Sequence, residues 1–305
     1  LIISTGTYNA DGASDIDGTL SITGTGVYDA DNTFTAASGN VTFTGAGFLR
    51  CNNTVTDLGT LSTGAGTVEY DGGTQAVLAD TYYNLEIDQA GTKTAQGAVN
   101  VNGTMTVQST GTPVYDVAAT TTTVTGTSTI AGTLNINGSG VYDGNGDFAA
   151  SGAITMDGTA RLQLSAAGSG VSNLGTLDNA AGTVEYDGGT QTVLSDNYFN
   201  LEIDESGVKT AGGALDIDGD LTVTAGELAM TSSNADVATG KTVNIVGILS
   251  ITTGTFTANG STSDIDGTLT INGGGIYDAD GDFDGTSSTV QFTGSGGTLR
   301  LGGAT

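Results

Sequence analysis

The chain lacks the residues on which most active sites depend. It has no histidine, no tryptophan, one proline and one cysteine among 305 residues. A single cysteine forms no intrachain disulfide, so the sequence defines no disulfide framework. Histidine, the most common general acid or base of enzymes, is missing. No apolar run approaches the roughly 18 residues of a membrane-spanning helix. We therefore expect no enzyme and no membrane insertion.

Positive charge is also scarce. Six Lys and Arg residues stand against 33 Asp and Glu residues, which gives a formal net charge of −27. Nucleic-acid binding depends on neutralising phosphates with Lys and Arg, so the composition argues for no nucleic acid as a partner. Metal cations and neutral surface glycans remain compatible with this charge.

Short strand-like runs fill most of the sequence. They alternate apolar residues with Thr, Asn, Asp or Glu, which is the pattern of a half-buried strand. Pairs such as Asn-Gly, Asp-Gly and Gly-Gly separate them and favour turns. The predicted strands are Gly18–Ile22, Asn40–Phe43, Thr67–Tyr70, Asn84–Ile87, Val99–Val107, Gly132–Ile136, Leu215–Val223 and Gly267–Ile271.

The chain repeats itself over long intervals. The nine residues TVEYDGGTQ occur at Thr67–Gln75 and again, unchanged, at Thr183–Gln191, which is 116 positions later. A second motif, with the sequence G(V/I)YD, places its tyrosines at Tyr28, Tyr142 and Tyr277, so they are 114 and then 135 positions apart. Residues 1–305 are therefore expected to form a single continuous array of tandem superrepeats, each about 114 to 135 positions long.

The difference between the two copies indicates the length of one turn. Gly97 and Gly132 are 35 positions apart, whereas the matching Gly213 and Gly267 are 54 apart, a surplus of 19. Solenoids tolerate insertions best when a whole turn is added. The sequence therefore predicts an all-β fold, a β-solenoid of about 19 residues per rung. An antiparallel sandwich is the rival fold, but two extra strands would disrupt its pairing.

Acidic corners follow the three tyrosine motifs and are candidates for calcium. Calcium prefers six to eight oxygen ligands, and a calcium loop places carboxylates at alternate positions. The third corner resembles the first half of such a loop, although position twelve from Asp280 is Gln291 instead of Glu. Ordinary turns are the alternative reading, because Asp and Asn favour turns. The candidate ligands are Asp29, Asp31, Asp143, Asn145, Asp147, Asp278, Asp280, Asp282 and Asp284.

Other polar residues also recur at repeat positions. Asp-Ile-Asp-Gly stretches, as at Asp15 and Asp17, offer carboxylate pairs that could serve glycoside hydrolysis. They recur along the chain, however, whereas an active site is a single place. We expect Lys93, its repeat Lys209 and the arginines to neutralise carboxylates such as Glu86 on adjacent rungs. Cys51 aligns with leucines and is expected to be a small buried residue.

The recurring GTLxI, TVEYDGGTQ and YYNLEID elements resemble the repeat arrays of secreted bacterial surface proteins. These are filamentous-haemagglutinin-like and autotransporter-like β-helical adhesins and fibre proteins. The resemblance covers nearly the whole chain as a style of repetition. It implies a right-handed parallel β-helix, an extracellular or cell-surface location, and a function as the shaft of a fibre, filament or adhesin. The alternative is a glycan-binding or glycan-cleaving β-helix.

The two ends carry a further expectation about partners. The stretch Ser4–Gly12 resembles Thr252–Gly260, and Gly297–Thr305 resembles Gly47–Thr54. Uncapped solenoid ends template further strand pairing. We expect Leu1 and Thr305 to adjoin more of the same array, either in a longer chain or in a subunit stacked head to tail.

Overall fold

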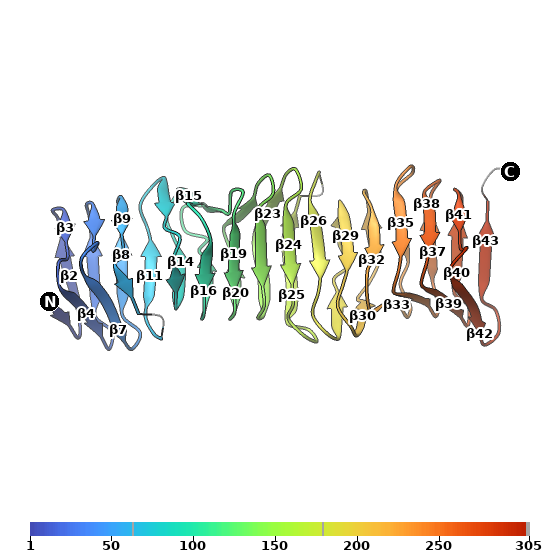
Figure 1. The fold of residues 1–305 in the computed structure, drawn as a ribbon, viewed down its shortest axis with the longest axis horizontal. Helices are drawn as coiled ribbons and strands as arrows, with labels where there is room; N and C mark the ends of the chain where they lie inside the picture. The colour runs from blue at the N-terminus through green and yellow to red at the C-terminus, as the bar shows by residue number, and fades with distance from the viewer. Residues whose placement is uncertain (63, 179, 303–305) are drawn as a thin grey trace. The chain divides into compact units, whose positions relative to one another are not determined.

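The computed structural model describes residues 1–62, 64–178 and 180–302. It is all-β, with parallel strands stacked into a β-solenoid of about 15 turns and a rung length of roughly 20 residues. The predicted all-β parallel solenoid is thereby confirmed (Figure 1). The chain divides into two compact units, Leu1–Thr155 and Met156–Thr305, and each is described by itself.

In the first unit, three strands make one rung, and equivalent strands of successive rungs pair in parallel. The first face contains β2 (Thr7–Ala10), β5 (Val27–Ala30), β8 (Phe48–Cys51), β11 (Thr67–Tyr70), β14 (Asn84–Ile87), β17 (Met105–Val107) and β20 (Ser128–Ile130). The second contains β3 (Ser14–Asp15), β6 (Phe34–Thr35) and β9 (Val55–Asp57), and then β12 (Gln75–Val77), β15 (Gly91–Ala95), β18 (Pro113–Asp116) and β21 (Thr133–Ile136). The third contains β1 (Ile2–Ile3), β4 (Thr19–Thr23), β7 (Asn40–Thr44) and β10 (Thr60–Leu61), and then β13 (Thr81–Tyr82), β16 (Val99–Val101), β19 (Thr121–Val124) and β22 (Val141–Gly144).

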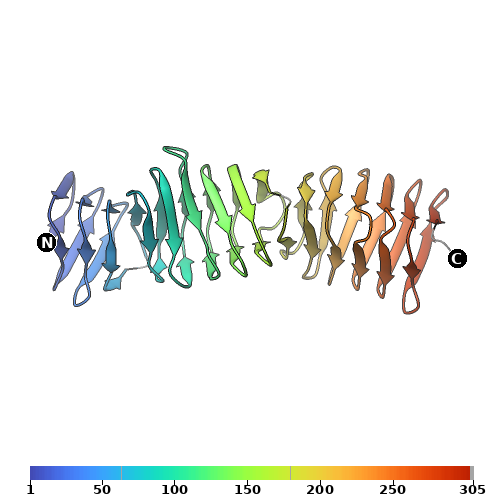
Figure 2. The same cartoon turned by 90° about the horizontal axis from the view of Figure 1, so that it is seen from above.

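The second unit repeats this plan after β23 (Phe148–Met156), β24 (Arg161–Leu164) and β25 (Val171–Leu177). One face contains β26 (Thr183–Tyr186), β29 (Asn200–Ile203), β32 (Leu221–Val223), β35 (Thr242–Ile245), β38 (Thr262–Ile265) and β41 (Phe283–Asp284). The next contains β27 (Gln191–Val193), β30 (Val208–Ala211), β33 (Glu227–Met230), β36 (Ile248–Ile251), β39 (Thr268–Asn272) and β42 (Thr289–Thr293). The last contains β28 (Asn197–Tyr198), β31 (Leu215–Ile217), β34 (Ala235–Val237), β37 (Thr255–Ala258), β40 (Ile276–Ala279) and β43 (Thr298–Leu301). The stacked strands of each unit are also visible in Figure 2.

Two predicted strands are wrong in their extent. Val99–Val107 divides into β16 and β17, and Leu215–Val223 divides into β31 and β32. Asn102-Gly103 in the first case and Asp218-Gly219 in the second turn the chain from one face to the next. Such pairs favour turns, so a corner replaces what looks like one long alternating strand.

Rung length varies around its mean. Strand register places Thr67 beside Asn84, a step of 17 positions, and Met105 beside Ser128, a step of 23. The predicted whole-turn insertion is confirmed. In the first copy β15 pairs with β18 and β18 with β21. In the second copy β30 pairs with β33, β33 with β36 and β36 with β39, so the second copy has one more rung over the matching stretch.

The core lies between the faces and is made of the inward residue of each alternating pair. Val, Ile and Leu stack from rung to rung, as in Leu49, Val68 and Leu85, which are register neighbours. Most tyrosines are also interior, and Tyr70, Tyr115 and Tyr142 are fully buried. Cys51 is buried and free, as expected.

Candidate functional site

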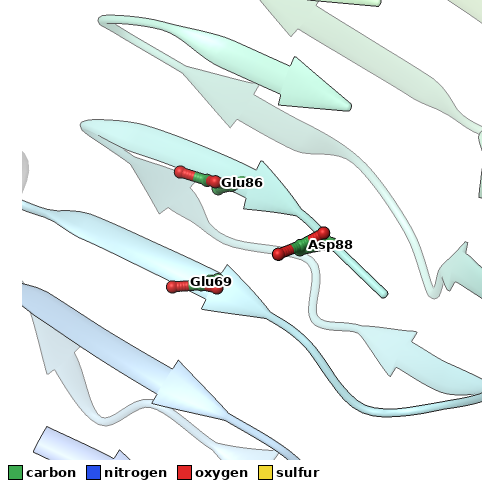
Figure 3. A group of neighbouring side chains, drawn as sticks. All are labelled: Glu69, Glu86 and Asp88. Atoms are coloured by element: carbon green, nitrogen blue, oxygen red, sulfur yellow. The ribbon is translucent and has the colours of Figure 1, made fainter. Parts of the chain in front are cut away.

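The repeated motif places three carboxylates together in each unit. In the first unit these are Glu69 on β11, Glu86 on β14 and Asp88 just after β14, as Figure 3 shows. Their ligand oxygens all lie within 4.8 Å of one another. The second unit repeats the group with Glu185, Glu202 and Asp204. Strand register explains both clusters, because Glu69 pairs with Glu86 and Glu185 with Glu202.

Arginine side chains neutralise part of each cluster. The Arg50 Nε donates a hydrogen bond of 2.8 Å to Glu69 Oε2. In the second unit the Arg161 Nη2 reaches two glutamates, with distances of 2.6 Å to Glu185 Oε2 and to Glu202 Oε2. The expectation that arginines pair with carboxylates of adjacent rungs is confirmed for these two residues.

Burial changes the protonation of the first cluster. Glu69 is only 5 % exposed, and this desolvation raises its pKa to about 7 although the Arg50 charge opposes the shift. Burial also raises the pKa of Asp71 to about 6, helped by the negative charge of Asp29. Among the described residues, one buried oxygen of Asp71 and one of Asp29 have no hydrogen-bond partner. Glu69 and its neighbour Asp71 therefore keep their protons to a higher pH than exposed carboxyl groups do.

The clusters have the ligand chemistry of a hard-cation site, but side chains already occupy several of the oxygens. Three carboxylates could supply part of the six to eight oxygens that calcium prefers. However, Glu69 Oε2 accepts from Arg50, and Glu86 Oε1 accepts a bond of 2.5 Å from Gln108 Nε2. In the second cluster Arg161 takes the place that a cation would occupy. The observed contacts thus tie neighbouring rungs together.

The glutamine that ends TVEYDGGTQ explains why this stretch is repeated. The Gln75 side chain is buried and donates from Nε2 to the carbonyls of Cys51 and Asn53, at 2.7 and 2.6 Å. Its Oε1 accepts from the backbone N–H of Gly72 at 2.8 Å. Gln191 makes the same three bonds, to Leu164, Ala166 and Gly188. The motif therefore fastens one rung to the backbone of the rung before it.

The glycine before the motif is required by close packing. Gly66 has a φ of 79°, a conformation that residues with a Cβ rarely adopt. A Cβ there would lie 2.2 Å from the Phe43 ring.

The prediction for Lys93 and Lys209 is wrong, because each of these two lysines turns inward to its own rung. The Lys93 Nζ donates to the carbonyls of Gln89 and Ala90, at 2.7 and 3.3 Å. Lys209 is equally buried and donates to the carbonyls of Asp204, Glu205 and Ser206. Gln89 and Glu205 both have positive φ, so the carbonyls of a tight turn converge on the ammonium group. The recurrence of lysines and carboxylates at repeat positions does not indicate that the lysine side chains turn inward.

The predicted calcium residues lie at separate corners. Asp31 accepts from Asn52, Asp278 is paired with Arg300 at 3.1 Å, and Asp284 accepts from Thr286. Of the remaining candidates, Asp29 and Asp143 lie within β5 and β22. The others follow β22 or β40 and are Asn145, Asp147, Asp280 and Asp282. Neither three-carboxylate group found among the described residues includes any of them. Calcium binding at these corners stays a prediction.

The sequence contains a signal for the two three-carboxylate clusters that the pattern analysis did not use. Glu69, Glu86 and Asp88 recur as Glu185, Glu202 and Asp204 at one constant offset of 116 positions. Their meeting depends on the short step from Thr67 to Asn84 and from Thr183 to Asn200, because a rung of the length inferred from the insertion would shift the glutamates out of register.

The fold and the duplicated cross-links define a parallel β-solenoid protein. Comparison with protein-family models, with curated proteins and with solved structures found no match to this chain. No helix long and apolar enough to span a membrane occurs in the described part of the chain.

Proposed function

We propose that this protein is a structural shaft of an extracellular or cell-surface fibre, filament or adhesin, and that its main partner is more of the same array. The observation that carries the proposal is the chemistry of the repeated residues. Gln75 and the Arg50–Glu69 pair connect adjacent rungs, and Lys93 holds a turn of its own rung. A stack of rungs needs such contacts in every repeat, whereas an enzyme needs its catalytic site only once.

The location of the aromatic residues supports the same proposal. Sugar-binding sites usually present aromatic rings to the ligand. Here Tyr70, Tyr82 and Tyr186 are fully buried between the faces, and Tyr8 and Tyr83 are the exposed tyrosines among the described residues. A groove of about 370 Å³ in the second unit is lined by Leu215, Asp216 and Asp236 together with small and polar residues, and contains no aromatic residue.

One observation favours the alternative of a glycan-binding or glycan-cleaving β-helix. Glu69 and Glu86 have carboxylate oxygens within 4.8 Å, and the pKa of Glu69 is raised to about 7. A carboxylic acid beside a carboxylate is the arrangement of a retaining glycosidase. The duplication of the cluster and the Arg50 contact favour the shaft.

Electron microscopy and glycan assays distinguish the two functions. For a shaft, we expect concentration-dependent end-to-end particles in negative stain and no saturable signal on a glycan array. The shaft proposal would be overturned if the protein hydrolysed a glycan, if Glu69→Gln abolished this hydrolysis, and if Asp11→Asn left it unchanged. Saturable glycan binding by particles that stay single at every concentration would overturn it as well.

A further inference from the structure

One rung in each unit interrupts two of the three sheets. In the first unit, the rung of β11, β12 and β13 follows the rung of β8, β9 and β10. Figure 1 labels β8 and β9 of the earlier rung and β11 of the later one. β11 pairs with β8 through four residues, from Thr67 opposite Phe48 to Tyr70 opposite Cys51. Among the described residues, β9 has no pairing with β12 and β10 none with β13, so the strand ladders on these two faces are interrupted here.

The second unit repeats this interruption at the same place in the motif. β26 pairs with β24 through four residues, whereas β27 and β28 each begin a sheet. In the described part of this rung, one isolated β-bridge, between Gly168 and Gln191, also connects it to the segment before β26. We call the rungs Thr67–Tyr82 and Thr183–Tyr198 joint rungs.

Rungs away from the joints are connected on every face. In the second unit, β32 pairs with β35, β33 with β36, and β34 with β37. Three parallel ladders thus hold each such rung, against one ladder at a joint. Side chains compensate at the joint itself, since the Arg50–Glu69 pair and the Gln75 bonds to Cys51 and Asn53 cross the same boundary.

We propose that the joint rungs are the points at which the solenoid opens first, and that Gln75 and Gln191 act as staples that control this opening. Local unfolding begins where few backbone hydrogen bonds and few buried contacts must be broken. Separation at a joint breaks one ladder and leaves the three-ladder blocks on either side intact. The proposal concerns the fold alone and stands apart from the shaft function.

The two joints differ in strength. The second joint carries extra contacts, because Gln163 donates to Glu185, Ser165 donates to Asp187, and the Gly168 bridge adds backbone bonds of 2.6 and 3.0 Å. The unpartnered oxygens do not distinguish the joints, because among the described residues each joint rung has one such buried oxygen, on Asp71 and on Asn197. It follows from the extra contacts that the joint at Thr67 opens more readily than the joint at Thr183.

Hydrogen exchange of the full chain, followed by mass spectrometry, tests this order. Peptides covering residues 71–83 should exchange faster than those covering 187–199, and both faster than block peptides such as 242–251. Gln75→Ala should accelerate exchange at the first joint by about tenfold or more, because two buried carbonyls lose their donor. Gln191→Ala should do the same at the second joint only.

The matched control removes a comparable bond inside a block. Ser261 is fully buried, and its hydroxyl donates to the Ala238 carbonyl of the preceding rung at 2.8 Å. Ser261→Ala should leave exchange at both joints unchanged. Uniform protection across joints and blocks, or equal acceleration of the joints by Ser261→Ala, would overturn the proposal.

A cross-linked variant keeps the test valid if Gln75→Ala fails to fold. Phe48 and Thr67 are register neighbours across the first joint. Neighbouring strands are ~4.8 Å apart, within the Cα range of a disulfide. In a Cys51→Ala background, Phe48→Cys with Thr67→Cys should slow exchange at residues 71–83 when oxidised and restore it when reduced. Unchanged exchange on oxidation would contradict opening at this joint.

Discussion

The hydroxyl groups of Tyr70 and Tyr82 lie 3.1 Å apart and close a ring of hydrogen bonds with Leu78. Tyr82 donates to the Leu78 carbonyl at 2.8 Å, and the Leu78 N–H donates to the Tyr70 oxygen at 3.2 Å. Because Tyr82 uses its only proton in this way, Tyr70 is the donor between the two tyrosines. Tyr186, Tyr198 and Leu194 form the same ring.

The first prediction concerns this ring. Tyr82→Phe should destabilise the protein by about 1–3 kcal/mol, because the half-buried Leu78 carbonyl and the buried Tyr70 hydroxyl each lose a partner. Urea unfolding measures the loss. Tyr83→Phe is the control, since Tyr83 is 36 % exposed and its change should stay within about 0.5 kcal/mol. Equal effects of the two substitutions would show that the ring contributes nothing.

The second prediction concerns pH. Burial raises the pKa of Glu69 from 4.5 to about 7, so the folded state binds more protons than the unfolded state between these values. Stability should therefore fall as pH rises from about 4.5 to about 7, and the contribution of Glu69 is on the order of 2 kcal/mol. Glu69→Gln should flatten this dependence, measured as urea midpoints from pH 5.5 to 8. Asp11→Asn, at an exposed position, should leave the slope as it is.

The third prediction concerns calcium. If the acidic corners bind it, calcium should raise the melting temperature more than magnesium does, and a chelator should reverse the effect. Free calcium at a hundred times its Kd would stabilise the fold by about 2.7 kcal/mol. Asp280→Asn with Asp282→Asn should reduce the shift, whereas Glu86→Gln with Glu202→Gln should not. The opposite pattern would place the ion at the three-carboxylate clusters, and no shift in any protein would mark the corners as ordinary turns.

The fourth prediction concerns rung deletion. Removing residues 227–247 deletes β33, β34 and β35 and brings Ile248 to the register position of Glu227. The shortened chain should keep its β-sheet circular dichroism and unfold cooperatively. Removing residues 227–236 leaves an incomplete rung and should abolish cooperative unfolding. Retention of the fold after the partial deletion would contradict the rung as the structural unit.

The sequence was sufficient to predict the parallel stack and the alternating pattern of its strands. Alternation identifies inward residues such as Leu20 and Ile22, and the surplus between Gly213 and Gly267 identifies a whole turn. Both signals are local or periodic, so they can be read without coordinates.

The contacts of the joint could not be predicted in the same way. Gln75 meets Cys51 and Asn53 only because their rungs are adjacent, and sequence alternation does not specify which carbonyls a buried amide reaches. The prediction for Lys93 was wrong for a related reason, because a tight turn of its own rung offers backbone oxygens that compete with any carboxylate.

The extra rung between β30 and β39 has a genetic consequence. The ladders inside a block are formed by backbone groups, so a segment encoding one rung can be duplicated by unequal recombination without redesigning its neighbours. The motif that staples each joint contacts only the rungs beside it. Alleles of such a gene can therefore differ in length by single turns while every joint remains intact.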